Sequence, residues 1–173
     1  MQLTCAMIIR KAEISDLENI MLMYKSCVTG MVENGIDQWD ESYPNDEIIS
    51  EDLNVGTYYI AEIDETIIGG INIDNNQDDT YLALDWEDKS DSFLVVHRLG
   101  VKQELWNKKI GKYLMLFTEK LVLEKGLKSI RLDTYSGNPK AMEFYRRLGY
   151  TELGTIDLKP NKDKYYCFEK IIK

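Results

Sequence analysis

The sequence predicts a mixed α/β fold in one domain, and three observations favour it. Apolar, β-branched runs alternate along the chain with segments of helical periodicity. Their order, one strand, two helices, three strands, a helix, a strand, a helix and two strands, suits a mixed sheet covered by helices. The length of 173 residues, without internal repeats or low-complexity stretches, suits a single domain over residues 1–173.

Strands are predicted where β-branched and apolar residues cluster. Only Asp64-Glu65 separates two of these runs, which indicates a hairpin although neither residue is glycine. Residues 74–91 are polar and rich in turn formers, so we expect an insertion or a long hairpin loop there. The seven predicted strands cover residues 7–11, 57–63, 66–73, 93–99, 129–134, 150–158 and 164–172.

Helices are predicted where apolar residues recur at helical spacing between capping signals. Ser15-Asp16 and Asn138 are suited to N-caps, and Pro139 is suited to a first helical turn. Gly126 and Gly149 follow the ends of two helices. The four predicted helices cover residues 16–30 or slightly beyond, 46–53, 110–123 and 138–148.

Composition argues against several classes of protein. No apolar run approaches the roughly 18–20 residues that a membrane span needs. The amino end lacks a secretory signal, and residues 1–6 are a dispensable extension if Met7 is the true start. One histidine cannot form a His cluster for zinc, so no metal site is expected. Three cysteines, odd in number and without metal-ligand spacing, suggest free thiols in a reducing cytoplasm: Cys5, Cys27 and Cys167.

Charge is distributed unevenly along the chain. The formal net charge of −9 argues against general nucleic-acid binding. Residues 31–91 hold 18 Asp or Glu and one Lys, whereas residues 92–150 hold 12 Lys or Arg and five acids. Either this is chance over solvated faces, or one half attracts a cation and the other a polyanion.

Residues 94–112 have the features of an anion site. A predicted strand is followed by a short polar connection and the start of a helix. Such a helix start presents unpaired N–H groups and the positive end of the dipole. Gly111 permits close approach of a phosphate to the backbone. Three lysines add positive charge here: Lys108, Lys109 and Lys112.

A second segment, residues 138–150, directly follows a predicted strand. It has the pattern Asn-x-x-Ala-x-x-Phe-Tyr-x-x-x-Gly-Tyr. Together and in this order, the two segments resemble the Gcn5-related N-acetyltransferase (GNAT) superfamily, over roughly residues 7–172. The usual Gln/Arg-x-x-Gly-x-Gly/Ala loop is altered: Trp106 stands at the Gln or Arg, Lys109 stands at the first Gly, and only Gly111 matches.

The resemblance implies a central, mostly antiparallel, twisted sheet flanked by helices. It also implies a cytoplasmic, acetyl-CoA-dependent N-acetyltransferase that acts on a primary amine of a small molecule or peptide. The transfer is expected to proceed by direct attack in a ternary complex, without metal. A homodimer is common in the family.

The resemblance also implies roles for individual residues. Backbone groups of Leu99 and Val101 are expected to hold the pantetheine arm and polarise the acetyl carbonyl, and Asn138 and Ala141 to line the cofactor channel. Tyr145 matches the general acid that protonates the leaving thiolate. If Lys109 must adopt a positive φ, it costs roughly 1–2 kcal/mol. The amides expected to bind the pyrophosphate belong to Asn107, Lys108, Lys109, Ile110, Gly111 and Lys112.

His97, the only histidine, lies on the strand leading into the expected cofactor site. An imidazole titrates near neutral pH, which suits a general base that acts directly or through water. A structural histidine bonded between strands is the alternative, and Asp133 and Glu62 are other candidate bases. In an unkinked strand, His97 and Leu99 would share one face.

In this family the acceptor site is built largely by the first two helices and their loop, here residues 30–54, together with the last hairpin. Aromatic rings with carboxylates suit an organic ammonium such as a polyamine, an amino sugar or a peptide amine. Candidate residues are Trp39, Tyr43, Asp37, Asp40 and Glu41, although Trp39 is equally suited to the core. Two further hypotheses are a catalytically degenerate CoA or acyl-CoA sensor of the same fold and, more weakly, a nucleotide-binding module.

Overall fold

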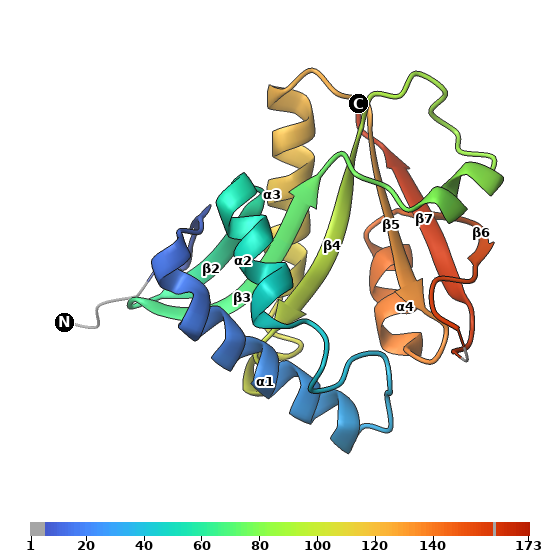
Figure 1. Cartoon of the computed structure of the whole chain (residues 1–173). Helices are drawn as coiled ribbons and strands as arrows, with labels where there is room; N and C mark the ends of the chain where they lie inside the picture. The colour runs from blue at the N-terminus through green and yellow to red at the C-terminus, as the bar shows by residue number, and fades with distance from the viewer. Residues whose placement is uncertain (1–5, 161) are drawn as a thin grey trace. The chain divides into compact units, whose positions relative to one another are not determined.

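Seven strands and four α-helices make up the computed structural model, which describes residues 6–160 and 162–173 (Figure 1). The strands are β1 (Ile8–Lys11), β2 (Tyr58–Ile63), β3 (Thr66–Asp74), β4 (Phe93–Val101), β5 (Ser129–Tyr135), β6 (Thr151–Ile156) and β7 (Tyr165–Ile171). The α-helices are α1 (Leu17–Glu33), α2 (Asp46–Val55), α3 (Ile110–Glu124) and α4 (Pro139–Arg147). Three short 3₁₀ helices, which the sequence did not reveal, are η1 (Ile14–Asp16), η2 (Asp79–Ala83) and η3 (Gln103–Leu105).

The strand order is β1-β2-β3-β4-β5-β7-β6. β4 and β5 run parallel, whereas β1–β2, β2–β3, β5–β7 and β6–β7 are antiparallel. The predicted fold class, a mixed α/β fold with a mostly antiparallel sheet, is confirmed.

The chain forms two compact units. Unit 1 comprises residues up to Ile73 together with Arg98–Phe117, and unit 2 comprises Asp74–His97 with Thr118–Lys173. β4 therefore contributes its first five residues to unit 2 and its last four to unit 1. Of the predicted extension at residues 1–6, positions 1–5, including Cys5, lie outside the described residues.

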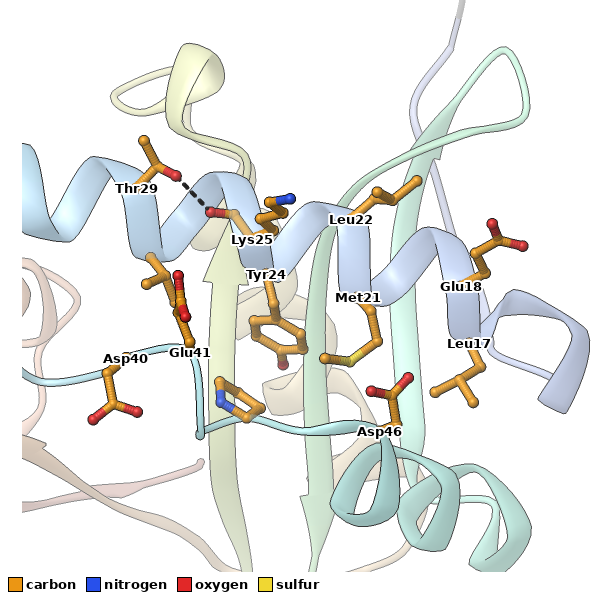
Figure 2. A pocket seen from close by; sticks show the side chains of 12 residues that line it. Leu17, Glu18, Met21, Leu22, Tyr24, Lys25, Thr29, Asp40, Glu41 and Asp46 are labelled. Carbon is orange, nitrogen blue, oxygen red and sulfur yellow. Dashed lines mark hydrogen bonds between the residues drawn. The ribbon is translucent and has the colours of Figure 1, made fainter.

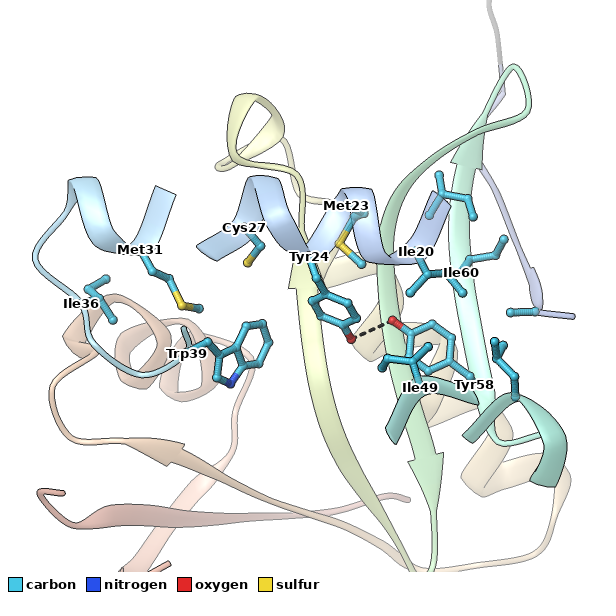
Figure 3. Packing of buried hydrophobic residues seen from close by; sticks show 13 residues of the cluster. Ile20, Met23, Tyr24, Cys27, Met31, Ile36, Trp39, Ile49, Tyr58 and Ile60 are labelled. Atoms are coloured by element: carbon cyan, nitrogen blue, oxygen red, sulfur yellow. Dashed lines mark hydrogen bonds between the residues drawn. The ribbon is translucent and has the colours of Figure 1, made fainter. Parts of the chain in front are cut away.

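In unit 1, α1 and α2 cover one face of the strands (Figure 3). Ile20, Met23 and Tyr24 of α1 recur at helical spacing and pack against Tyr58 and Ile60 of β2. These two strand residues are two apart and share a face. This apolar core positions the loop between the two helices and the end of β4.

The opposite face of unit 1 is covered by the start of α3. A side chain at Gly69 of β3 would lie 3.1 Å from Ile110 and 3.2 Å from Leu114, so glycine lets α3 approach closely. The predicted hairpin is also confirmed: Asp64 and Glu65 join β2 to β3 with φ values of 48° and 59°. Two central residues with positive φ are typical of a tight hairpin turn whose twist matches the strands.

In unit 2, residues of the segment between β3 and β4 bury an aromatic cluster against the strands. Tyr81 and Trp86 from this segment pack with Val95 of β4 and Cys167 of β7. α4 packs on the other face, where Tyr145 contacts Phe168, the residue after Cys167. Residues 74–91, called the insertion below, thus connect β3 to β4 and carry core residues.

Cys27 and Cys167 are buried free thiols. Within the described part of the chain, no helix is both long and apolar enough to cross a membrane. Nor do residues 6–160 and 162–173 contain a group of three or more His, Cys, Asp or Glu side chains placed to hold a metal ion.

Candidate functional site

The end of β4 is kinked at Arg98, which has a φ of 54° in the left-handed region. Nε and Nη2 of Arg98 donate to the carboxylate of Asp52 in α2 at 2.9 and 2.6 Å. The carbonyl oxygen of Arg98 accepts the hydroxyl of Tyr24, whose own oxygen accepts the hydroxyl of Tyr58 at 2.7 Å. The simple alternation of faces that an unkinked strand would have therefore ends at Arg98.

The groups that hold this kink are largely removed from water. The side chains of Arg98 and Asp52 are only 14% and 11% exposed. Burial raises the pKa of Tyr24 and of Tyr58 well above the ordinary value, so both hydroxyls stay protonated and donate. The backbone of Leu99, the next residue, is thereby fixed in a direction set by α1 and α2.

Trp106 explains how the altered loop after β4 is held. Its indole Nε1 donates to the carbonyl oxygen of Val101 at 2.9 Å, and its ring packs against the core of unit 1. A side chain at Gly30 of α1 would come within 2.7 Å of this ring, so glycine at that position makes room for it. Trp106 thus fastens the loop to α1 at the position where the family pattern has Gln or Arg.

The start of α3 presents a row of backbone amides. The first helical bond runs from the amide of Tyr113 to the carbonyl of Lys109 at 3.0 Å. Helix geometry leaves the amides of residues 110–112 without acceptors inside the helix. Lys108, Lys109 and Lys112 are exposed beside them. These donors and charges suit a pyrophosphate.

Two loop residues before α3 adopt left-handed backbone conformations. Asn107 has a φ of 65° and Lys109 a φ of 68°. Asparagine tolerates this region better than most residues, whereas a lysine there costs about 1–2 kcal/mol. Lys109, at the position of the family's first glycine, thus does adopt a positive φ and bears the steric cost that was expected in that case.

In unit 2, α4 begins as the sequence predicts. Oδ1 of Asn138 accepts the amide of Ala141 at 3.1 Å and caps the helix. Tyr145 is 7% exposed, and its ring lies 5.9 Å from that of Phe168. Burial, together with the charge of Asp133, raises the pKa of Tyr145, so the phenol remains protonated at neutral pH.

His97 is held by the start of the insertion in unit 2. Its Nε2 lies 2.9 Å from Oδ1 of Asp74 and 3.1 Å from the carbonyl oxygen of Asn76. Because both neighbours are acceptors, Nε2 carries the proton in the neutral ring and Nδ1 carries the lone pair. This tautomer leaves Nδ1 available to accept a proton.

The two alternative bases, Glu62 and Asp133, each have a partner within their own unit. Glu62 pairs with Arg10 in unit 1 at 2.9 Å. Asp133 accepts the hydroxyl of Tyr81 in unit 2 at 2.5 Å. Burial raises the pKa of Asp133, against the lowering effects of Tyr81 and His97.

The predicted acceptor aromatics pack together. Trp39 is 8% exposed, and its ring lies 5.6 Å from that of Tyr24 and 6.4 Å from that of Tyr43. The hydroxyl of Tyr43 accepts from Arg98 at 3.5 Å. Asp37 and Asp40 are exposed. Trp39 therefore lies in the core, while the carboxylates lie at the surface.

A groove of about 630 Å³ lies between α1 and the loop before α2, within unit 1 (Figure 2). Tyr24, whose hydroxyl holds Arg98, lines it. Its apolar lining comes from Leu17, Met21, Leu22, Val28 and Pro44. Four carboxylates and a single lysine also line it: Glu18, Asp40, Glu41, Asp46 and Lys25. This combination suits an elongated organic cation.

The predicted residues thus fall into two groups. The groove, Leu99, Val101 and residues 107–112 belong to unit 1. His97, Asn138, Ala141 and Tyr145 belong to unit 2.

A family model described as the acetyltransferase (GNAT) family matches residues 18–150. The chain belongs to this family. Among curated proteins, the GNAT chain is similar to a spermidine N(1)-acetyltransferase of Thermoplasma acidophilum, with 29% identity over 153 residues, 82% of this chain and 86% of the relative.

Solved GNAT structures share the fold. A Streptococcus agalactiae acetyltransferase of the GNAT family has a TM-score of 0.79 at 22% identity, with 96% of both chains covered. The PaiA N-acetyltransferase of Thermoplasma acidophilum, in complex with coenzyme A, has a TM-score of 0.69 at 23% identity over 96% of this chain and 99% of that one.

Sequence reasoning missed two sets of residues. In unit 2, Tyr81 and Trp86 of residues 74–91 pack against β4 and β7, and two aromatics in an otherwise polar segment are the signal that could have revealed this packing. In unit 1, Glu18 and Asp46 line the groove but look in the sequence like ordinary surface acids near helix starts.

Proposed function

We propose that this GNAT chain transfers an acetyl group from acetyl-CoA to a primary amine of a cationic small molecule. The observation that carries the proposal is the amide row at the start of α3, flanked by three lysines and preceded by two left-handed residues. Such a row favours a diphosphate group, which is the anionic part of CoA.

Bound acetyl-CoA would supply a thioester carbonyl open to attack by an amine. We assign its pyrophosphate to the amides of residues 107–112, except that of Lys108, which donates to the carbonyl of Leu105 at 3.2 Å. We assign its pantetheine arm to backbone groups of Leu99 and Val101. Since Trp106 already donates to the Val101 carbonyl, the arm would use other backbone groups at this end of the strand. Asn138 and Ala141 of unit 2 are further proposed contacts for the cofactor.

The proton transfers would fall to two side chains. Nδ1 of His97 would take the proton that the ammonium must lose before its nitrogen can attack. Tyr145, neutral because of its burial, would give its proton to the sulfur when the C–S bond breaks. The products are an N-acetylated amine and free CoA.

For the acceptor, we propose a linear polyamine. The groove runs beside α1 from Leu17 to Thr29, about 18 Å at the rise of an α-helix. Its apolar lining suits methylene segments, and its carboxylates suit the ammonium groups between them. The named activity of the Thermoplasma relative concerns a molecule of this class.

The proposed binding of acetyl-CoA and the transfer of its acetyl group are tested by calorimetry followed by a thiol-release assay. Acetyl-CoA should bind with a micromolar dissociation constant that weakens as salt is raised, because exposed lysines are screened. With spermidine, Tyr145→Phe should lower kcat about 100-fold or more, while the dissociation constant of acetyl-CoA stays within about twofold.

Two other outcomes would contradict this proposal. Binding without thiol release, for a broad panel of amines, would favour a CoA sensor. The indole bond to the Val101 carbonyl is the observation in favour of that alternative, because it occupies an acceptor that the pantetheine arm could use. Absence of acetyl-CoA binding would reject both functions.

The proposed binding of the polyamine in the groove is tested by replacing carboxylates that line it. Glu18→Gln with Asp46→Asn should raise the Michaelis constant for spermidine about three- to tenfold, because two exposed ion pairs are lost. The constants for acetyl-CoA and for butylamine should not change. Glu47→Gln is the matched control, since Glu47 shares the first turn of α2 with Asp46 but does not line the groove. Equal effects of both variants would remove the groove from the acceptor site.

We propose that the carboxylates of the loop before α2 contact the cation and that its two aromatic residues do not. Asp37, Asp40 and Glu41 remain proposed contacts for the cation, and their joint replacement by amides should also raise the constant for spermidine. Trp39 and Tyr43 would shape the site through packing. A homodimer and a cytoplasmic location remain predictions.

A further inference from the structure

One face of unit 2 is covered by the insertion that follows β3. Arg131 and Asp133 of β5 are two residues apart and point to this face. Val95 and Cys167 pair with these two residues and belong to the cluster that Tyr81 of the insertion completes. The insertion is therefore packed directly over the strand that carries Asp133.

A buried clamp around Arg131 fixes the insertion in place. Arg131 is 3% exposed, and its guanidinium lies 4.5 Å from the ring of Trp86 and 4.0 Å from that of Phe93. It donates to the carbonyl of Asp88 at 2.8 Å and lies 3.5 Å from the carboxylate of Glu169. A cation enclosed by rings and acceptors holds the segment more rigidly than a solvated loop.

The clamp places Tyr81 over Asp133. Tyr81 is 1% exposed, and its carbonyl accepts the indole N–H of Trp86 at 2.8 Å. Its hydroxyl donates to Oδ2 of Asp133 at 2.5 Å. An ionised carboxylate accepts such a bond better than a neutral one, so Tyr81 favours the charged form of Asp133.

Asp133 lies beside the candidate base. Val96 with Leu132 is the last registered pair between β4 and β5, and His97 and Asp133 are the next residue in each strand. Residues at matching positions of parallel strands point to the same face. Asp74, at the start of the insertion, bonds His97 directly, while Asp133 and His97 interact through their charges.

We propose that Tyr81 and Asp133 form a positioning pair for His97, delivered by the insertion, that stabilises the proton His97 receives during acetyl transfer. This inference rests on the proposed function, in which His97 is the base. The amine proton goes to Nδ1 of His97, and none is transferred to Asp133, which acts through its charge alone.

The titratable groups that act most strongly on the pair belong to unit 2. Burial raises the pKa of Asp133, and Tyr81 and the charge of His97 oppose that effect. The other titratable groups that influence it are Asp78 of the insertion, Lys159 after β6, Cys167 of β7 and Tyr145 of α4. The charge of Asp133 also favours the protonated form of Tyr145, as its role as acid requires.

The test uses His97 as its own reporter. Since the chain has one histidine, its ring gives a single set of carbon-bound proton signals that can be titrated by NMR without any activity. Asp133→Asn removes a negative charge beside the ring, so the midpoint of this titration should fall by about half a pH unit or more. Tyr81→Phe should move it in the same direction but less, because Asp133 is then less fully ionised.

The same variants are then compared in the transfer reaction. The acid limb of the kcat/KM profile should move with the NMR midpoint, and kcat should fall about tenfold in Asp133→Asn. His97→Ala should abolish this effect of Asp133→Asn, because two groups that act as a unit are not additive. Tyr166→Phe, on neighbouring β7, is the matched control and should change neither value.

Each result bears on the pair. An unchanged midpoint in Asp133→Asn would overturn it, as would a shifted midpoint with an unshifted rate profile. If Asp133→Asn does not fold, the titration midpoint and the rate profile of Tyr81→Phe are used instead, and an unchanged midpoint in that variant would overturn the pair. If the parent chain acetylates no amine, the proposed function fails, and the NMR titration still shows whether Asp133 acts on His97.

Discussion

At the scale of single residues, Lys109 adopts a backbone conformation that its side chain disfavours. It adopts a φ of 68° immediately before α3, with Asn107 at 65° two residues earlier. A lysine in this region pays a steric cost that a glycine does not. What the chain gains is a further positive charge beside the amide row.

Lys109→Gly should therefore stabilise the fold. Relief of about 1–2 kcal/mol of strain, less the greater entropy of glycine in the unfolded chain, leaves a gain of about 0.5–1 kcal/mol in the free energy of unfolding. Urea denaturation would measure it. Acetyl-CoA binding should meanwhile lose part of its salt dependence, because one cation is gone.

Lys108→Gly provides the comparison, because Lys108 carries the same charge without a left-handed backbone. It should weaken the salt dependence similarly and give no gain in stability. Equal stability changes in the two variants would mean that the strain at Lys109 is relaxed by its surroundings.

At the scale of elements, α2 controls the shape of β4. Asp52 is the α2 residue that pairs with Arg98, and Tyr24 of α1 binds the carbonyl of the same residue. Two helices that are distant in sequence from β4 thus hold one of its residues, Arg98, in a strained backbone conformation just before Leu99. A strained backbone persists only where surrounding contacts over-determine it.

Asp52→Asn should release this restraint. It leaves a largely buried guanidinium without its carboxylate, which lowers the free energy of unfolding by about 3–5 kcal/mol. If the kink orients the backbone of Leu99, kcat should fall by more than the loss of folded protein explains. Denaturation and steady-state assays on the same sample separate the two effects.

The neighbouring acid offers a matched control. Glu51→Gln changes an exposed carboxylate on the same helix and should leave stability and kcat close to those of the parent chain. If both variants behave alike, the Asp52–Arg98 pair has no special part in shaping β4.

At the scale of the whole molecule, residue clustering, periodicity and capping predicted each strand and α-helix that the described residues form. The Asn138 cap and the Asp64-Glu65 hairpin were predicted because their signals are local, a side chain next to the amides it binds or two residues between two strands. The amide row before α3 was predicted for the same reason, since a helix start always exposes such groups.

Features that depend on distant partners were not predictable in this way. The kink at Arg98 is held by residues 46 and 74 positions away in the sequence. The insertion looked like solvated loop because its aromatics follow no period, and Arg131, which binds the carbonyl of Asp88, lies 43 positions further along the chain. Local pattern carries no information about such pairings.

The folded structure shows that only some of the acidic residues between positions 31 and 91 face the groove. Among the acids of residues 31–91, Asp52 and Asp74 have structural partners, and Asp88 is 9% exposed. Asp40, Glu41 and Asp46 instead face the groove. The count of charges therefore overstates the attraction for a cation, which we assign to the few carboxylates in the groove.

The bond between Trp106 and Val101 gives the molecule an optical probe of its own. Trp39 and Trp86 are 8% and 5% exposed and lie within apolar clusters, so their fluorescence should respond little to ligands. Trp106 is half-buried, and its indole N–H binds the strand to which we assign the pantetheine arm. A change in emission on adding CoA would therefore report occupancy from this ring, in solution and without a label.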